Sequence, residues 1–392
     1  MSKVSDWSIT PVVEWLFKDG RLIKNQSEFV AEFARQVTAQ GSVLDRMQIT
    51  FRTLNPQVLA TAETWERESD EVTSFIAEHA VMETGRYIGS PMQQLRETLR
   101  TVHQSLIDLP ADAHGAFQDL YQESYTDYYA FPVSFTQELF CAYICVTKDP
   151  DGFSKSDIEN LKALRDYIAP ILEVFSLRHT ANSLMNTYVG RRTAQKVLSG
   201  MVKRGDADII NAALWFSDLR DFTQLTEELP AAEILATLNE YFQFVSEAIS
   251  ARGGEILRFI GDAMLIVFPI DKNTSAANAC NEALAAALDA QSTLDEVNQQ
   301  RRNNNQPQIQ FGVGLNVGEV IYGNVGALDR LDFTVMGPAV NRTARLESLT
   351  KSLGTEILMS REFADLVEKP VRDMGKHMMK GVAIKQQVWA LE

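Results

Sequence analysis

The sequence predicts an α/β (α+β) protein made of two domains and a connecting helix. The chain has 392 residues, more than one hydrophobic core usually organises, and its 45% apolar content is ample for two cores. A helical pattern near the middle of the chain separates two halves that are organised differently. In the second half, patterns typical of a strand, a helix, a strand pair, a helix, a strand pair and a helix follow one another, which indicates a ferredoxin-like arrangement.

Residues 1–152 mix helical and strand patterns, and we expect them to form one domain. Helices are expected around 29–37 and at 92–106, strands at 46–54, 128–135 and 139–146, and a turn at 149–152. Strands flanked by helices and followed by a long helix resemble a sensory module of the GAF type. This resemblance implies a regulatory domain.

The sequence of this domain identifies no ligand. Its histidines are scattered, so a metal or haem site is not expected. The tyrosines at 121, 125, 128 and 129 are expected to pack in a core rather than line a chromophore pocket.

Residues 153–204 are expected to form connecting helices. The segment from Ser154 to Asp157 is typical of a helix start, and apolar residues then recur at helical spacing as far as Phe175. The helix is expected to continue, with or without a break, to Gly190, and 191–200 predicts a second, short helix. Such a helix serves either ordinary packing or a signalling connection that also pairs with its copy in a dimer.

Residues 205–392 are expected to form the second domain. Its elements are predicted as a strand at 209–216, a helix at 231–251 ended by two glycines, strands at 255–260 and 263–268, an alanine-rich helix at 273–300 and a polar loop at 301–307. A tight turn at Gly261-Asp262 would bring Asp262 beside the end of the first strand, close to Asp218. Two carboxylates placed in this way can hold divalent cations, although a single Asp more often serves a turn.

Four segments of this half form an ordered set. They are FSDLRDFT at 216–223, GGEILRFIGDA at 253–263, FGVGLNVG at 311–318 and DFTVMGPAVNRTAR at 332–345. In order and in spacing they resemble the catalytic domain of class III nucleotidyl cyclases. The resemblance implies a cyclase fold that converts a nucleoside triphosphate to a cyclic nucleotide and pyrophosphate. It also implies two divalent ions per site, Mg²⁺ or Mn²⁺.

The resemblance assigns roles to residues of this chain. It implies Asp218 and Asp262 as metal ligands, with the backbone carbonyl of Leu219 as a further ligand. Phe222 and Thr223 follow at a helix start, where free amide groups favour phosphate.

A second group of residues would contact the rest of the nucleotide. Asn341 and Arg345, four residues apart on one helix face, would position the ribose and donate to the charge on the α-phosphate. On its own, such a pair more often forms a solvated surface stripe. Lys380 would contact the terminal phosphates, and Arg330 is a weaker candidate for the same task.

Base choice depends on Arg258 and Thr334. Arg258 stands where adenylyl cyclases usually carry lysine and guanylyl cyclases glutamate, and a cationic donor suits adenine N1, which is an acceptor. Thr334 stands where many members carry aspartate, resembles a bacterial-type subgroup and can accept from the adenine amine. Adenine, and therefore ATP, is favoured. Arg258 in place of lysine and Asp221 in place of the glycine common in the first motif are departures that could weaken activity or selectivity.

In this family the metal ligands and the base-reading residues come from different subunits, which implies a homodimer through the catalytic domain, together with the connecting helix. Three interpretations remain: an adenylate cyclase regulated by the N-terminal domain, a catalytically weak or silent nucleotide-binding regulator, and a guanylate cyclase. A diguanylate cyclase or polymerase is disfavoured because no Gly-Gly-Asp-Glu-Phe segment is present.

The net charge and the hydropathy of the chain limit which binding partners and which cellular location are expected. The formal net charge of −15 disfavours a nucleic-acid partner, because backbone binding needs clustered Lys and Arg. Apolar runs are too short for a transmembrane segment, and the first residues lack an apolar signal region. Three cysteines without a metal-ligand pattern suit a reducing compartment, so a cytoplasmic location is expected.

Overall fold

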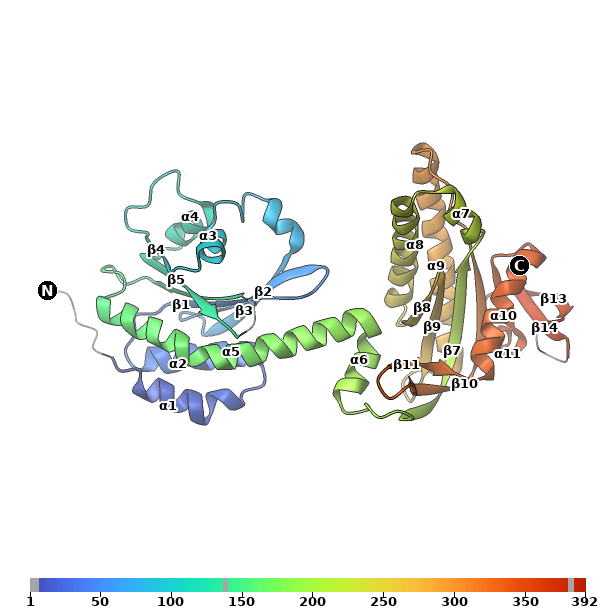
Figure 1. Cartoon of the computed structure of the whole chain (residues 1–392), viewed down its shortest axis with the longest axis horizontal. Helices are drawn as coiled ribbons and strands as arrows, with labels where there is room; N and C mark the ends of the chain where they lie inside the picture. Colours follow the sequence, from blue (N-terminus) through green and yellow to red (C-terminus); the bar gives the residue numbers. More distant parts are fainter. Residues whose placement is uncertain (1–6, 137–139, 380–383) are drawn as a thin grey trace. The chain divides into compact units, whose positions relative to one another are not determined.

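The computed structural model describes residues 7–136, 140–379 and 384–392. The chain divides into two compact units, Met1–Thr187 and Tyr188–Glu392 (Figure 1). Both units combine a β-sheet with helices, so the α/β fold class is confirmed. No helix in the described part of the chain is both long enough and apolar enough to cross a bilayer.

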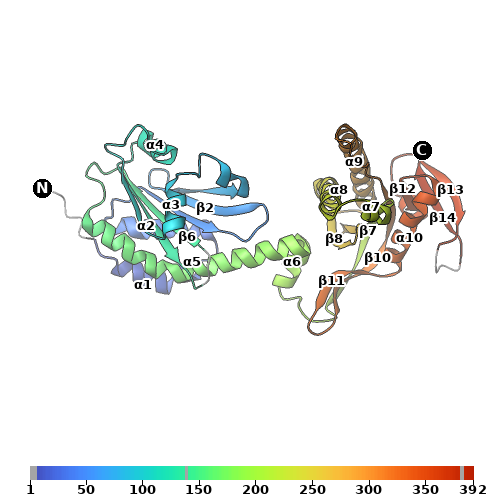
Figure 2. The ribbon, with the colours of Figure 1, turned by 45° about the horizontal axis from the view of Figure 1, so that its top comes forward.

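The first unit is built on a six-stranded antiparallel sheet with strand order β3-β2-β1-β6-β5-β4. The strands are β1 (Arg46–Arg52), β2 (Val58–Glu66), β3 (Glu71–Glu78), β4 (Val102–Ser105), β5 (Asp127–Ser134) and β6 (Phe140–Thr147). One face is covered by α1 (Thr10–Lys18), α2 (Gln26–Ala39) and the first part of α5 (Lys155–Val189), with η1 (Gly20–Leu22) between α1 and α2. The other face carries η2 (His79–Glu83), α3 (Pro91–Thr98) and α4 (Gly115–Gln122) (Figure 2).

Alternate residues of β6 enter two different cores, because successive side chains of a strand point to opposite faces. The helix-covered core of α1, α2 and α5 receives Cys141, Tyr143 and Cys145, and the smaller core under α3 and α4 receives Ala142, Ile144 and Val146. Burial raises the pKa of Cys145 to about 12 and that of Cys141 further. The two cysteines therefore share one strand face.

The helix predicted at 92–106 is wrong beyond Thr98. Helix α3 ends where Leu99 adopts a left-handed conformation, with φ of 51°, and strand β4 follows at Val102. Val102 and Leu106 are buried in the core beneath α3, so tertiary packing outweighs the helical spacing of the apolar residues. The sequence patterns also missed strands β2 and β3.

The connecting helix begins as predicted. Ser154 Oγ accepts a hydrogen bond from the Asp157 amide (3.1 Å), and the Asp157 carboxylate accepts one in return from the Ser154 amide (3.0 Å). This reciprocal pair resembles a capping box, in which a side chain at each end satisfies a free amide. Helix α5 continues to Val189 as one element although Pro170 lies inside it, and α6 (Arg191–Leu198) follows after Gly190.

The second unit contains an eight-stranded sheet in which β7 (Ala207–Leu219) lies between β10 (Phe311–Gly326) and β9 (Ala263–Ile270). The path β13-β14-β12-β10-β7-β9-β8 uses β8 (Glu255–Ile260), β12 (Ile357–Ser360), β13 (Val371–His377) and β14 (Gln386–Leu391), and β11 (Leu331–Met336) pairs with β10. Helices α8 (Ala231–Ala251) and α9 (Ala276–Asn303) cover one face, and α10 (Pro338–Leu353) covers the other. The short helices are α7 (Phe222–Glu228) and α11 (Arg361–Ala364).

The polar loop predicted from residue 301 begins three residues later than expected, at Asn304. Helix α9 continues to Asn303, and Arg301 is only 4% exposed. Its guanidinium donates to Pro307 O (2.6 Å) and Thr237 Oγ1 (3.1 Å) and pairs with Glu240. Each of the three guanidinium nitrogens of this buried cation has a partner, so Arg301, which was expected in a surface loop, belongs to the packed interior.

Candidate active site

Asp218 and Asp262 come together at one edge of the sheet. Asp218 is the second-last residue of β7, and Asp262 lies in the turn between β8 and β9. Strand β7 pairs with β9 through Ser217 and Met264, so the end of one strand lies beside the start of the other. Gly261 has φ of 66°, a left-handed conformation that L side chains rarely adopt, and this keeps the turn tight.

The surroundings of Asp218 suit a cation. Its Oδ1 atom is buried without a hydrogen-bond partner in the described part of the chain. Burial, the neighbouring Asp262 and, less strongly, Glu347 raise the pKa of Asp218 to about 7. Carboxylates that repel one another in a partly dry site are stabilised by positive charge between them.

This donor set fits magnesium bound together with a phosphate substrate. Within residues 7–136, 140–379 and 384–392, no group of three or more His, Cys, Asp or Glu side chains is arranged to hold a metal. Mg²⁺ typically uses one or two carboxylates and completes its shell with water and substrate phosphate oxygens. The carbonyl of Leu219 is close in sequence, although the Leu219 side chain is buried in the core.

Glu347 is a third acidic residue here, and the sequence analysis missed it. It lies on α10, is 8% exposed, and has its pKa raised to about 7, mainly by burial, with Asp262 adding to the rise and Arg220 opposing it. Gly312 and Gly314 on β10 make room for it. A Cβ atom at Gly312 would lie 2.6 Å from Glu347 Oε1, and one at Gly314 would lie 2.5 Å from the Glu347 amide nitrogen. Alternate glycines on one strand face were the available sequence signal.

Asn341 and Arg345 lie four residues apart on α10, as predicted. Asn341 is exposed and Arg345 is half-buried. Among the described residues, neither side chain has an ion pair or hydrogen bond, whereas neighbouring Arg342 pairs with Glu362 at 3.2 Å. No contact of that kind joins Asn341 or Arg345 to the two aspartates within the residues that the structure describes. Arg345 is therefore a cation without an ion pair or hydrogen bond in the part of the chain that the structure describes.

The two residues expected to read the base lie on β8 and β11, which pair with β9 and β10 respectively and not with each other. Arg258 is on β8, and Thr334 is on β11, 7% exposed and opposite Gly323. Arg258 Nη2 pairs with Asp332 Oδ2 at 2.5 Å, and both side chains are about half exposed. Asp332 was not singled out from the sequence as a contact of Arg258. The Asp332 carboxylate is an acceptor, and it occupies the Arg258 guanidinium that was expected to donate to the base.

The residues expected near the phosphates are spread over several segments. Phe222 and Thr223 begin α7, with Phe222 partly buried against the core and Thr223 exposed. Asp221 precedes them with φ of 58°, and its carboxylate pairs with Lys351 Nζ at 2.5 Å. The negative charge expected next to the phosphate loop is thus balanced by a lysine.

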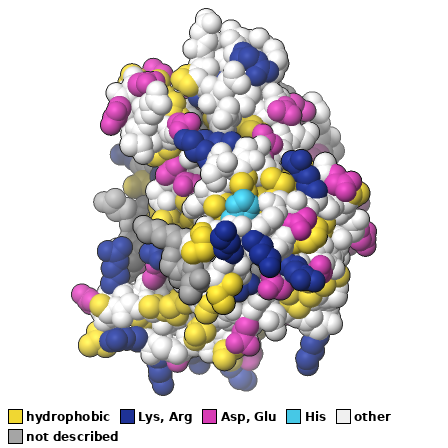
Figure 3. Space-filling model, turned by 90° about the vertical axis from the view of Figure 1, so that its right-hand side faces the viewer, with side chains coloured by type: hydrophobic (Ala, Val, Ile, Leu, Met, Phe, Trp, Pro, Cys, Tyr) yellow, Lys and Arg dark blue, Asp and Glu magenta, His cyan; other side chains and the backbone are white. Residues whose placement is uncertain are grey.

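Arg330 is exposed in the turn between β10 and β11, where its carbonyl accepts from the Ala327 amide (2.9 Å). Lys380 lies outside the described residues. The face of the second unit that includes β13 carries several Lys and Arg side chains gathered around a histidine (Figure 3). Positive charge is therefore available locally on an acidic chain.

Comparison with known proteins gives consistent results for the second unit. Residues 207–392 match the model of the adenylate and guanylate cyclase catalytic domain. An adenylate cyclase from Anabaena cylindrica is 34% identical over 188 residues, which are 47% of this chain and 36% of that protein. Adenylate cyclase 1 from Rhizobium meliloti is 34% identical over 170 residues, 43% of this chain and 24% of that protein. The match thus spans about a third or less of these relatives.

Among solved structures, a bacterial light-regulated adenylyl cyclase aligns over 89% of this chain and 94% of its own, with a TM-score of 0.50 and 19% identity. At this identity the similarity concerns the fold alone.

Proposed function

Residues 207–392 are a class III adenylate and guanylate cyclase catalytic domain, and from this premise we propose that the chain is an adenylate cyclase that converts ATP to 3′,5′-cyclic AMP and pyrophosphate. The observation that carries the proposal is the convergence of Asp218 and Asp262 at a sheet edge, with Asp218 Oδ1 left without a partner among the described residues. In the reaction, the ribose 3′-oxygen forms a bond to the α-phosphorus while the bond from that phosphorus to the pyrophosphate oxygen breaks.

Asp218 and Asp262, with the Leu219 carbonyl, would hold two divalent ions, Mg²⁺ or Mn²⁺. When bound, such ions lower the pKa of the ribose hydroxyl and neutralise phosphate charge. Arg345 donates to the negative charge that grows on the α-phosphate, and its lack of an ion pair within the described chain supports this role. Asn341 orients the ribose.

The remaining contacts belong to the base and the terminal phosphates. Arg258 donates to adenine N1 and Thr334 accepts from the N6 amine. The amides of Phe222 and Thr223, with Arg330 and Lys380, bind the β- and γ-phosphates.

Activity in this proposal requires a homodimer, formed through the catalytic domain and the connecting helices. Among the described residues, no hydrogen bond or ion pair joins Arg345 or Asn341 of α10 to Asp218 or Asp262, which supports sites shared between two copies. The N-terminal unit then regulates how the copies meet. Free, buried cysteines support a cytoplasmic location.

A second candidate is a catalytically weak or silent nucleotide-binding regulator. The observation that favours it is the ion pair of Arg258 with Asp332, which occupies a group expected to read the base.

One experiment separates the candidates. The purified chain is incubated with Mg²⁺ or Mn²⁺ and with ATP or GTP, and the products are identified by mass spectrometry. Cyclic AMP formed from ATP, lost on chelation of the metal, is the expected result. Binding of ATP without product would support the silent regulator, and cyclic GTP as the main product would overturn the choice of adenine.

A further inference from the structure

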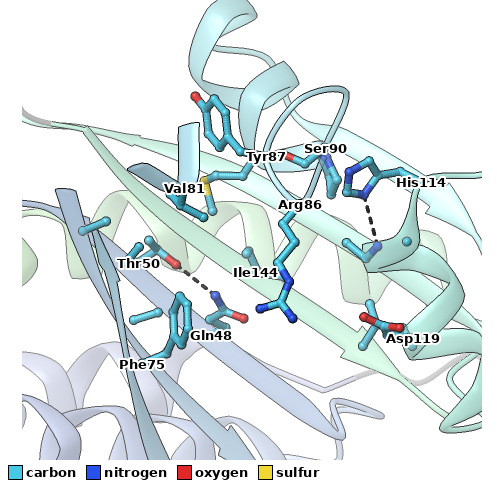
Figure 4. Close-up of a pocket in the computed structure, with 18 of the residues that line it drawn as sticks. Gln48, Thr50, Phe75, Val81, Arg86, Tyr87, Ser90, His114, Asp119 and Ile144 are labelled. Carbon is cyan, nitrogen blue, oxygen red and sulfur yellow. Dashed lines mark hydrogen bonds between the residues drawn. The ribbon is translucent and has the colours of Figure 1, made fainter. Parts of the chain in front are cut away.

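A cavity of about 650 Å³ lies in the first unit, between the sheet and the segment that contains η2, α3 and α4 (Figure 4). It opens on the sheet face opposite α1, α2 and α5. Its volume lies within the range of about 300–1,000 Å³ that is typical of small-molecule sites. None of its lining residues belongs to the cyclase domain.

The floor of the cavity is mostly apolar. Small side chains of β2 and β3, Ala60, Ala62 and Ala77, leave space above the sheet, and Phe75 and Ile144 border it. Phe75 is 57% exposed although it is a large apolar side chain. Ala62 lies opposite Phe75 and Ala60 opposite Ala77, and an aromatic side chain beside such small side chains suits a planar, apolar ligand body.

A cationic side chain reaches over this floor. Arg86 comes from the loop between η2 and α3 and points toward the sheet, between Ile144 and Asp119 (Figure 4). No ion pair or hydrogen bond of the Arg86 side chain exists within the described residues. The other arginine of the lining, Arg46, already pairs with Glu66 (3.3 Å) and Glu123 (3.2 Å).

The loop that carries Arg86 is held on both sides. His114 Nε2 lies 3.0 Å from the Gly85 carbonyl oxygen, and Tyr87 OH accepts a hydrogen bond from Arg96 Nη1 (3.0 Å). Because both neighbours of Arg86 are held in place, its backbone is already ordered before a ligand binds. The loss of conformational entropy on binding is therefore smaller. Gln48 and Thr50, hydrogen-bonded to each other at 3.1 Å, add polar atoms to the floor.

We propose that this cavity binds a planar aromatic carboxylate, with its ring over the alanine floor beside Phe75 and its carboxylate paired with Arg86. A single negative charge on the ligand matches the Arg86 guanidinium, which has no ion pair among the described residues. The charged lining residues, Arg46 and Arg86 against Asp119 and Glu123, sum to zero and Arg46 is already paired, so Arg86 can balance one carboxylate but not both charges of a phosphate monoester. A guanidinium fork matches the two oxygens of a carboxylate.

The test uses the full-length chain and two probes of the same shape, 2-naphthoate and uncharged 2-naphthalenemethanol, in titration calorimetry. We expect wild-type protein to bind 2-naphthoate at least about tenfold more tightly than the alcohol, the difference that one charge-assisted pair supplies. Arg86→Gln should remove this preference without changing the affinity for the alcohol. Arg100→Gln changes an exposed arginine outside the lining and should leave both affinities unchanged.

A second variant tests the position of the ligand. Ala77→Phe fills space above the floor and should weaken the binding of both probes, with an unfolding midpoint close to that of the wild type. The proposal is wrong if the wild type binds neither probe or binds both equally. It also fails if Arg86→Gln behaves like Arg100→Gln, or if a folded Ala77→Phe variant keeps both affinities.

Discussion

Asp218 shows how a single side chain connects local structure to chemistry. Its place near the end of β7 is fixed by pairing with β9 and β10, and that pairing also fixes which sheet face it joins. Burial and Asp262 raise its pKa to about 7, so the charged form of Asp218 is unfavourable unless a cation lies beside it. Removal of the carboxylate should therefore harm function without harming the fold.

We predict that Asp218→Ala and Asp262→Ala each lower cyclic nucleotide formation by more than about a hundredfold, because a divalent ion loses a carboxylate ligand. The unfolding midpoint should stay the same or rise, since two repelling groups are separated. Product is measured by mass spectrometry and stability by thermal unfolding. Asp329→Asn, in an exposed turn, is the control. Near-normal turnover in either alanine variant would rule out the two-metal assignment.

Arg258 and Asp332 give a second prediction at this scale. Replacing Arg258 by Glu sets an acceptor against adenine N1, which should lower kcat/KM for ATP by about tenfold or more, whereas Arg258→Lys should keep the preference for ATP. Asp332→Asn releases the guanidinium from an exposed ion pair worth at most about 1 kcal/mol, so kcat/KM should rise no more than about fivefold. Equal ATP turnover in all these variants would show that Arg258 does not contact the base.

At the scale of elements, the sequence predicts best where local signals decide the structure. The helix expected at 231–251 has those bounds in the structure, and the connecting helix begins after the expected Ser154. The predictions fail where contacts with residues distant in the sequence determine the local structure. Leu99 ends a helix because the following residues pack as a strand, and Arg301 is buried because a neighbouring helix supplies Glu240.

The same reason explains which parts of the sites were missed. Aspartates in short strand-like segments are visible in the sequence, whereas Glu347 becomes part of the site only because Gly312 and Gly314 lie under α10. The cavity of the first unit depends on alanines from two strands and a loop arginine, which no local pattern brings together.

One link between elements predicts a pH effect. Glu255 at the start of β8 accepts hydrogen bonds from the Arg192 and Thr193 amides at the start of α6, at 3.1 and 3.4 Å, and from Tyr322 OH. Its pKa is raised, mainly by burial, with these hydrogen bonds opposing the rise. The folded state thus keeps the proton to higher pH than the unfolded state, whose pKa is about 4.3, and stability falls as pH rises between the two values.

We predict that Glu255→Gln, which keeps the shape and an acceptor oxygen, makes the free energy of unfolding of the second unit less dependent on pH between the two pKa values. At neutral pH the variant should be at least as stable as the wild type. Denaturant unfolding at several pH values measures both effects, and Glu319→Gln, an exposed acid on β10, is the control. An unchanged slope would show that Glu255 does not titrate differently in the folded state.

At the scale of the whole molecule, the homodimer with shared sites that we propose has a numerical consequence. Mixing Asp218→Ala with Arg345→Ala produces mixed dimers with one intact site. With random exchange of equal amounts, half the dimers are mixed, so about a quarter of wild-type activity should return. Mixing Asp218→Ala with Asp262→Ala should restore no activity. Each site takes both aspartates from one chain, so both sites of the mixed dimer lack a metal ligand. Failure of the first mixture despite demonstrated subunit exchange would exclude the composite site.

Because the native cysteines are buried, the subunit-mixing experiments can be followed with a label attached to one introduced cysteine. Cys141, Cys145 and Cys280 are enclosed in the two cores, and burial raises the pKa of Cys145 and of Cys280 to about 12. Only a thiolate reacts quickly with maleimides, and at neutral pH these side chains remain thiols out of reach. A cysteine introduced on the surface would therefore carry a fluorescent or spin label alone, in the otherwise native protein.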